Sequence, residues 1–325
     1  MRLHGNKELF RQAIQATSDQ MGILPIYVEK DYWVTVVLYA LFHAEISSEI
    51  VFKGGTALSK CFQMIERFSE DIDLVVLRKD GESNNKMKTK IKTIGKIVND
   101  ILPEIHIEGL TQKMGMNRKT AHQYEKVFGG DFGQVRDVIV LEATWLGDYE
   151  PFTTKPVSSL ITQIMAKSGQ EMMIEEYDLS PFNVRVLEPS RTICEKIMSL
   201  VRFSYTEDPI SDLKKKIRHA HDLHQLLNDD DLSEFLESIN FDKLLLKVAK
   251  DDVPSFKNNN DWLKHHPNDA VMFKNLENIW RELAPVYNNE FSKLVYGTLP
   301  NEKDVLKTLI KLRTRMAEID WKIFE

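Results

Sequence analysis

The segment from Phe52 to Val76 constrains the fold more than any other part of this 325-residue chain. A short β-branched run, Glu49 to Phe52, is closed by Gly54-Gly55, and apolar residues then recur at helical spacing from Ala57 to Ile65. A second apolar run, Ile72 to Leu77, follows directly after acidic residues. The pattern predicts a strand, a tight glycine turn, a helix and a second strand.

Two carboxylates open the second predicted strand. Alternate side chains of a strand share a face, so Asp71 and Asp73 project together while Ile72 and Leu74 point into the core. Carboxylates held a few ångströms apart repel each other, and a bound cation relieves that repulsion. Oxygen ligands suit Mg²⁺ or Mn²⁺. The Asp-x-Asp pair is therefore a candidate metal site, although such a pair taken alone is more typical of a solvated turn.

The glycine turn is a candidate phosphate site. Gly54 and Gly55 allow a tight turn with exposed backbone N–H groups, and the helix predicted from Thr56 adds its positive end. Thr56 and Ser59 supply hydroxyl groups at the same place. A Gly-Gly pair alone indicates only a turn, but this order of elements puts a phosphate cradle and metal ligands on one edge of one sheet.

The remaining pattern predicts an α+β protein with two domains. Helices are expected around Leu9 to Ala16 and Tyr32 to Ala40, joined by a turn at Gly22 to Pro25. A helix at Met87 to Leu102 and strands at Ala121 to Phe128 and Asp137 to Trp145 complete a small mixed sheet flanked by helices. After Pro189 the apolar spacing is helical almost throughout, at Thr192 to Phe203, Ser211 to Leu227, Phe241 to Ala249, Met272 to Leu283 and Asp304 to Trp321, with a long loop at Asp251 to Asp269. We expect domains at 1–187 and 188–325.

Three stretches together resemble the AbiEii/AbiGii toxin family of nucleotidyltransferases, in the DNA polymerase β-like superfamily. They are Glu29-Lys30-Asp31-Tyr32-Trp33, Phe52-Lys53-Gly54-Gly55-Thr56-Ala57-Leu58-Ser59-Lys60 and Arg67-Phe68-Ser69-Glu70-Asp71-Ile72-Asp73-Leu74. The resemblance implies a polymerase β-like core followed by an all-helical C-terminal half. It also implies that Gly54 and Gly55 hold a nucleoside triphosphate and that Asp71 and Asp73 hold Mg²⁺.

The resemblance further implies a third carboxylate on a later strand beside the Asp-x-Asp strand. Glu142, flanked by apolar residues, is the candidate metal ligand. The alternatives are that Asp137 or a more distant acid fills this role, and that Glu142 only pairs with a lysine.

Two residues of the helical half complete the set that the resemblance implies. Lys196 is expected to contact nucleotide phosphate, and Asp222 to orient it or to assist the acceptor. Arg218 and Asp222 are one helical turn apart, so an ordinary ion pair between them is equally compatible with the spacing. His219, His221 and His224 are interpreted as surface histidines in preference to a metal cluster. Glu29, Lys30 and Asp31 either support the cleft or form a solvated turn.

Composition excludes several classes of protein. The longest apolar run, Trp33 to Phe42, is too short for a bilayer span of about 20 residues, and the polar start of the chain does not resemble a secretion signal. We therefore expect a cytoplasmic protein with no membrane contact. Cys61 and Cys194 lack a partner at metal-ligand spacing and are expected in the core. The net charge of −6 does not indicate global nucleic-acid binding, and the basic stretches Lys86 to Lys96 and Lys214 to Arg218 are either solvated helix faces or acceptor-binding surfaces.

The predicted activity is transfer of a nucleoside monophosphate from an NTP to an acceptor with release of pyrophosphate. Within the family this activity belongs to the toxin of a toxin-antitoxin pair, which implies a tRNA or protein acceptor and a separate antitoxin chain. Two other readings stay open: a non-catalytic module that binds nucleotide or polyanion, and a nucleotidyltransferase acting on a small molecule. An intact Asp-x-Asp pair disfavours the first, because a module without turnover gains nothing from two carboxylates that repel each other.

Overall fold

A computed structural model describes residues 1–69, 71–113, 115–130 and 135–324. The described chain folds into two compact units. The first unit takes the described residues of Met1–Gln63, Phe68–Trp145 and Phe152–Val186, and the second those of Met64–Arg67, Leu146–Pro151 and Leu187–Glu325. Two short segments from the first half of the sequence thus belong to the second unit.

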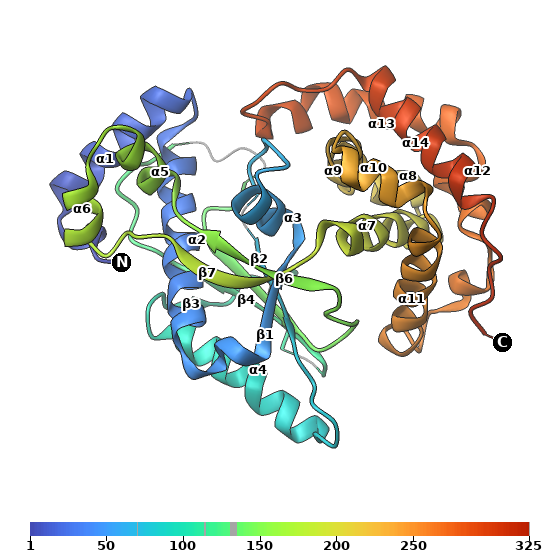
Figure 1. Ribbon diagram of the computed structural model, residues 1–325, viewed down its shortest axis with the longest axis horizontal. Coiled ribbons are helices and arrows are strands. Elements are labelled where there is room, and N and C mark those ends of the chain that lie inside the picture. Colours follow the sequence, from blue (N-terminus) through green and yellow to red (C-terminus); the bar gives the residue numbers. More distant parts are fainter. Residues whose placement is uncertain (70, 114, 131–134, 325) are drawn as a thin grey trace. The chain divides into compact units, whose positions relative to one another are not determined.

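The first unit is built on one mixed sheet, seen in Figure 1. Its seven strands, counted over the described residues, run in the order β3-β4-β5-β2-β1-β7-β6. Their bounds are β1 Ile50–Lys53, β2 Asp71–Val76, β3 Glu104–Ile105, β4 Asn117–His122, β5 Ile139–Thr144, β6 Phe152–Val157 and β7 Phe182–Leu187. Strand β2 pairs antiparallel with β1 and parallel with β5, and this register sets Asp73 opposite Glu142. The α+β prediction is confirmed, with a larger sheet than expected.

The two faces of this sheet differ in chemistry. On one face, the apolar side chains of β2 and β5, among them Ile72, Leu74 and Leu141, join the main core. Helices supply the rest of that core: α1 Lys7–Met21, α2 Pro25–His43, α4 Asn84–Asn99, α5 Leu160–Lys167 and α6 Glu171–Glu176. Because side chains alternate along a strand, the other face carries Asp71, Asp73 and Glu142. One face therefore makes the core, and the opposite face carries the candidate site.

Helix α2 lies at the centre of that core. Pro25 occupies its first turn, where no backbone donor is needed, and Gly22 ends α1 in the left-handed conformation with φ 67°. Most of its side chains are buried, which explains why its sequence is apolar on nearly every side. The two N-terminal helices and the turn between them agree with the sequence prediction.

The strand boundaries depart from the prediction in three places. The strand expected at Ala121 to Phe128 runs instead over Asn117–His122, because its pairing with β5 begins earlier and ends at His122. Helix α3, Gly54–Ala57, includes the glycine pair and continues as a π-helical turn, Leu58–Phe62. Strands β3, β6 and β7 were not predicted at all.

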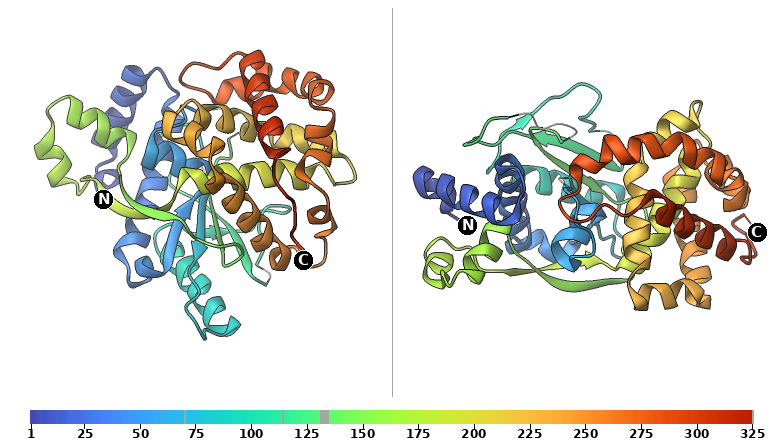
Figure 2. Two further views of the ribbon diagram at one scale, coloured as in Figure 1. Left: turned by 45° about the vertical axis from the view of Figure 1, so that its right-hand side comes forward. Right: turned by 90° about the horizontal axis from the view of Figure 1, so that it is seen from above.

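The described part of the second unit is helical, as Figure 2 shows for the ribbon after residue 187. Its helices are α7 Pro189–Phe203, α8 Pro209–Lys215, α9 Ile217–Leu227, α10 Asp230–Glu237, α11 Ile239–Ser255, α12 Val271–Lys274, α13 Leu276–Asn289 and α14 Glu302–Met316. The single helix predicted at Ser211 to Leu227 is two helices, because the backbone leaves helical geometry at Lys216, whose ammonium lies 4.5 Å from the centre of the Phe203 ring. The predicted loop at Asp251 to Asp269 begins with the last turn of α11 and contains two short 3₁₀ turns.

Along the described residues, no helix is both long and apolar enough to cross a membrane.

Candidate active site

Three carboxylates meet on the polar face of the sheet in the first unit. Asp71 and Asp73 lie two residues apart on β2, and Glu142 on β5 is the register partner of Asp73. We call Asp71, Asp73 and Glu142 the carboxylate face. Since adjacent strands run about 4.8 Å apart, three negative groups share a small area.

Asp73 has a pKa that is changed by this crowding. Burial, followed by repulsion from Asp71 and Glu142, raises the pKa of the Asp73 carboxyl to about 7. Gly54 makes its position possible: a Cβ on Gly54 would come within 2.3 Å of Asp73 Oδ2, and the backbone there has φ +83°. Only glycine satisfies both the close approach and the left-handed backbone. The glycine turn and the carboxylate face are thus one packed structure.

Glu142 is held by the neighbouring strand β4. Its Oε1 accepts a hydrogen bond from Asn117 Nδ2 at 2.9 Å, and its Oε2 accepts one from Lys119 Nζ at 3.0 Å. Burial acts to raise the pKa of Glu142, but Lys119 and Asn117 outweigh it and the pKa lies below its ordinary value. Glu142 therefore lies beside Asp73 and also pairs with Lys119, so its role as a metal ligand stays a prediction.

The other acid weighed for this place, Asp137, is engaged elsewhere. Its Oδ2 accepts from Lys126 Nζ at 2.6 Å, and this hydrogen bond, against a smaller effect of burial, lowers the pKa of Asp137. Asp71 contacts the neighbouring Arg136, whose Nη1 lies 3.4 Å from Asp71 Oδ1. A guanidinium thus stands at the outer end of the carboxylate face.

The hydroxyl groups of Thr56 and Ser59 both donate hydrogen bonds to backbone carbonyls. Thr56 is buried, donates to the backbone carbonyl of Asp71 at 2.7 Å and lies 3.0 Å from Ser69 Oγ. Ser59 donates to the carbonyl of Thr56 at 3.1 Å. Thr56 therefore ties the turn to the first residue of the Asp-x-Asp strand.

The charged triplet at the start of α2 is buried, so the solvated-turn alternative is wrong. Glu29 accepts backbone N–H groups from Val127 at 2.6 Å and Phe128 at 3.0 Å, and burial raises its pKa against these bonds. Lys30 donates to the carbonyl of Arg136. The triplet therefore anchors the backbone that leads toward β5.

Asp31 anchors the glycine helix in the same way. Its Oδ1 lies 2.5 Å from Lys60 Nζ, and its Oδ2 accepts the backbone N–H of Leu160 at 2.8 Å. Lys60 also donates to Thr35 Oγ1 at 2.8 Å. These contacts hold the helix that contains Gly54 and Gly55 in place, which agrees with the supporting role that the sequence allowed for Asp31.

The second unit contains a different cluster of buried charge, made by Arg67, Lys196, His221 and Asp222, which we call the Arg67 cluster. Arg67 donates hydrogen bonds from Nε and Nη2 to the two carboxylate oxygens of Asp222, each at 2.6 Å. Only 2% of the Arg67 side chain and 0% of the Asp222 side chain are exposed. Lys196 Nζ donates to Asp222 Oδ2 at 2.7 Å, and His221 Nδ1 lies 3.2 Å from Oδ1. One carboxylate is thus shared by two cations and a histidine.

These cations decide the state of Asp222. Burial favours the neutral acid, but Arg67 and Lys196 hold the pKa of Asp222 well below its ordinary value. Burial, opposed by Asp222 and reinforced by the like charge of Arg67, lowers the pKa of Lys196. Within the described residues, the basic partners of Asp222 are Arg67 and Lys196, and the pairing with Arg218 that the helical spacing allowed is not formed.

The surface interpretation of the three histidines is wrong for two of them. His221 is fully buried beside Asp222, with the Phe291 ring 4.9 Å away. His224 is also buried, and its Nδ1 lies 2.8 Å from Thr308 Oγ1. His219 is half-buried, with its ring Nδ1 enclosed, so it is not a freely exposed histidine either. Helix α9 packs these side chains inward because Asp222 and its neighbours lie on its core side.

The residues suit a divalent cation by their chemistry. In the part of the chain that the structure describes, no three His, Cys, Asp or Glu side chains are gathered as a ready-made metal site. Glu142 is directed at Asn117 and Lys119, and Asp71 contacts Arg136. The repulsion that raises the pKa of Asp73 is nevertheless the condition that a cation relieves, and all three side chains offer oxygen ligands.

Several residues of the site had no predicted role. Asn117 and Lys119 carried a usable signal, since they alternate with Ala121 on the strand beside Glu142. Arg67 lies inside the motif that contains Asp71, but nothing local pointed to a partner 155 residues away. Of the basic stretches, Lys90 on α4 is buried between Glu49 and Glu82, whereas Lys86, Lys88, Lys92 and Lys96 are exposed.

With this geometry in place, the comparison with protein families is decisive. The sequence model of the family described as "Nucleotidyl transferase AbiEii toxin, Type IV TA system" matches residues 36–309. The chain belongs to this family. AbiEii members are nucleotidyltransferase toxins, and the resemblance drawn from the three motifs is confirmed.

Two solved structures are similar to this AbiEii chain. One is MenT4, a nucleotidyltransferase toxin of Mycobacterium tuberculosis H37Rv, at 16% identity and a TM-score of 0.40, covering 94% of this chain and 99% of that one. The other comes from H. pylori and is titled as a candidate nucleotidyltransferase, at 17% identity and a TM-score of 0.36, covering 87% and 96%. A search of curated protein sequences finds no match.

Proposed function

We propose that this AbiEii protein transfers a nucleoside monophosphate from an NTP to a hydroxyl group of a tRNA or protein acceptor. The acceptor oxygen bonds to the α-phosphorus, the bond to the bridging oxygen breaks, pyrophosphate leaves with the electron pair, and the hydroxyl proton passes to water. The observation that carries the proposal is the carboxylate face, where Asp73 is packed against Gly54 and repelled by Asp71 and Glu142.

In this proposal Asp71, Asp73 and Glu142 hold Mg²⁺ or Mn²⁺. The bound cation would neutralise phosphate charge and lower the pKa of the acceptor hydroxyl. Asn117 and Lys119 orient Glu142, and Thr56 fixes the carbonyl of Asp71. Gly54 and Gly55 present backbone N–H groups to the triphosphate, while Ser59 and Thr56 stiffen the turn. The protein's contribution is positioning and charge neutralisation.

We also propose a role for Lys196 and Asp222 within the second unit. Lys196 supplies a cation for a nucleotide phosphate, and Asp222 orients Lys196 through the 2.7 Å contact. Asp222 has each of its oxygens engaged by a basic partner, which supports an orienting role over direct assistance to the acceptor.

The family description also guides the proposal for partners. A type IV toxin-antitoxin system implies a cognate antitoxin, which would be a separate chain. Because NTPs and tRNA are cytoplasmic, we place the proposed reaction in the cytoplasm.

The test is label transfer from each α-³²P-labelled NTP in the presence of Mg²⁺, with total tRNA and cell extract as acceptors. The double variant Asp71→Asn, Asp73→Asn is the control. Transfer that vanishes in the control supports the proposal and reveals the acceptor class. Absence of both transfer and Mg²⁺-dependent nucleotide binding contradicts it and favours a binding module, and transfer only to small molecules contradicts the acceptor.

Lys196→Ala tests the contribution of the second unit. Removing the ammonium should weaken NTP binding, measured as KM and by equilibrium binding, because phosphate loses a cationic partner. Unchanged NTP affinity would show that Lys196 does not contact the nucleotide and acts only within the Arg67 cluster.

A further inference from the structure

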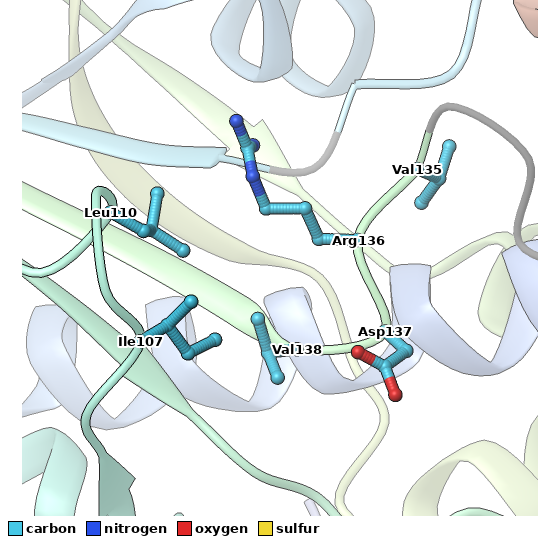
Figure 3. Close-up of a pocket in the computed structure, with 6 residues that line it drawn as sticks. All are labelled: Ile107, Leu110, Val135, Arg136, Asp137 and Val138. Atoms are coloured by element: carbon cyan, nitrogen blue, oxygen red, sulfur yellow. The ribbon is translucent and has the colours of Figure 1, made fainter.

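A cavity of about 490 Å³ opens on the first unit beside the carboxylate face, shown in Figure 3. Its lining residues are Ile107, Leu110, Val135, Arg136, Asp137 and Val138. A volume of this size lies within the usual range of about 300–1,000 Å³ for ligand pockets. Nothing in the proposed chemistry has yet used it.

The cavity lies on the same face of the sheet as the carboxylates. Val138 packs with Val140 and Ala121 in a small cluster separate from the main core, and Ile107 and Leu110 cover that cluster. Alternation along β5 puts Val138 and Val140 on the face of Glu142. Val140 is the register partner of Asp71, so Val138 lies roughly 7 Å along the strand from that position, at about 3.3 Å per residue.

In-line chemistry assigns this side to the acceptor. The glycine turn follows β1, the carboxylates lie on β2 and β5, and the cavity lies at the start of β5, with the strands in the order β5-β2-β1. If the proposed triphosphate lies at the glycine turn, pyrophosphate leaves toward β1. The attacking and leaving oxygens are roughly in line across phosphorus, so the acceptor approaches from β5.

The lining indicates the chemistry of the acceptor's reacting end. Ile107, Leu110 and Val138 offer apolar walls to a planar ring, and Figure 3 shows the Arg136 and Asp137 side chains extending to different sides. Arg136 is 43% exposed and contacts Asp71, so its guanidinium stands between the cavity and the carboxylate face. Asp137, the negative group of the lining, is neutralised by Lys126 at 2.6 Å.

We propose that this cavity binds the terminal nucleoside of a polynucleotide acceptor, with the base against the apolar lining and the adjoining phosphate on Arg136. The inference rests on the proposed nucleotidyl transfer. An aliphatic wall accepts the face of a base, and a guanidinium is the preferred partner of a phosphate. A nucleoside ring also occurs in the NTP, and the experiment separates the two sources.

The first experiment measures binding of a 5′-fluorescein oligoribonucleotide by anisotropy, in the absence of NTP and over a series of salt concentrations. Arg136→Gln should lower the salt slope by about 0.7, the value for one phosphate contact to a single strand, and Arg136→Lys should restore it. Arg78→Gln, an exposed arginine of the same unit, should leave the slope unchanged. An unchanged slope in Arg136→Gln would overturn the phosphate contact.

The second experiment removes the terminal base of the oligoribonucleotide and the Leu110 side chain of the cavity separately. Leu110→Ala should weaken binding about fivefold, the loss expected for uncovering part of one aliphatic side chain, and Leu24→Ala, an exposed leucine, should not. An oligoribonucleotide with an abasic 3′ residue should bind wild type about as weakly, and the two losses should not add. Additive losses would place the terminal base elsewhere and overturn the proposal.

The transfer assay then identifies the source of the nucleoside. Arg136→Gln and Leu110→Ala should raise KM for the oligoribonucleotide and leave KM for the NTP unchanged. A rise in KM for the NTP alone would overturn the acceptor assignment, and so would labelling of protein with no labelling of RNA. If wild type labels no acceptor at all, it is the proposed function that fails.

Discussion

The carboxylate face and the Arg67 cluster bury aspartates in opposite ways. Around Asp73 the nearest charged groups include two more carboxylates, and its pKa is raised to about 7. Around Asp222 the nearest charged groups are Arg67 and Lys196, and its pKa is held well below the ordinary value. The same residue type is therefore crowded in one unit and satisfied in the other. The repulsion around Asp73 favours binding of a cation. The ion pairs around Asp222 are already complete and hold the surrounding protein in place.

The largest expected effect comes from breaking the satisfied cluster. Asp222→Asn leaves Arg67 and Lys196 buried without their anion, which should lower the free energy of unfolding by about 3–5 kcal/mol. Urea denaturation of the full chain measures this. Asp304→Asn, which removes an exposed carboxylate paired with Lys307 at 2.7 Å, should leave the free energy of unfolding almost unchanged, because exposed ion pairs contribute little. Equal losses in the two variants would contradict the account of the Arg67 cluster.

The second prediction concerns Gly54, which packs against Asp73 of the carboxylate face. Gly54→Ala places a Cβ against Asp73 Oδ2 at a left-handed backbone position and should displace the carboxylate. Such a shift should reduce transfer about 100-fold. Gly81→Ala is the matched control, since Gly81 has a similar φ of +77° and nothing within 4 Å of the added Cβ. If both variants lose activity equally, backbone strain and not the Asp73 contact explains the loss.

The third prediction concerns pH in the absence of divalent cations. The raised pKa means that folded Asp73 keeps a proton that the unfolded chain has already released above its ordinary pKa of 3.8. The free energy of unfolding should therefore fall as pH rises from about 5 to about 7, by on the order of 2–3 kcal/mol. Asp73→Asn should remove this fall while keeping the fold and abolishing transfer.

Urea unfolding with EDTA at about pH 5 and about pH 8 measures that difference. Asp80→Asn, at an exposed position, should behave as wild type. A pH dependence that is the same in wild type and Asp73→Asn would show that Asp73 is not crowded.

The smallest expected effect is that of removing Arg218. Arg218 has the right spacing to pair with Asp222, but Arg67 and Lys196 occupy that carboxylate. Arg218→Ala should change the free energy of unfolding by less than about 0.5 kcal/mol. A loss close to that of Asp222→Asn would restore the helical pair suggested by the spacing.

Local pattern explains how much of the fold and the site was predictable. The glycine turn and the Asp-x-Asp strand are short-range features whose alternation and spacing carry their geometry. Glu142, on a distant strand, follows from the family resemblance together with its apolar neighbours. Strand β7 also alternates, with Phe182, Val184 and Val186 buried, but it lies alone between helices α6 and α7, far along the chain from the predicted strands. Strand β6 lies at the end of the sheet and contains Pro156, which a sequence reading takes as a break although an edge strand tolerates it.

Long-range pairing explains what was missed. Arg67 and Asp222 are 155 residues apart, and no periodicity links them. The burial of Glu29, Lys30 and Asp31 depends on backbone groups near Val127 and Leu160, which the helix α2 alone does not reveal. His221 was assigned to the surface in preference to a metal cluster, because His219, His221 and His224 do not share one helical face. The burial of His221 beside Asp222 depends on packing that this spacing does not reveal.

Divalent-cation binding tests the central claim most directly, followed by the EPR signal of free Mn²⁺ during titration of the protein. The account predicts that wild type and Asp137→Asn bind Mn²⁺, that Glu142→Gln binds more weakly, and that the Asp71→Asn, Asp73→Asn double variant does not bind. Mn²⁺ binding by the double variant with wild-type affinity would contradict the assignment of the carboxylate face as the metal site.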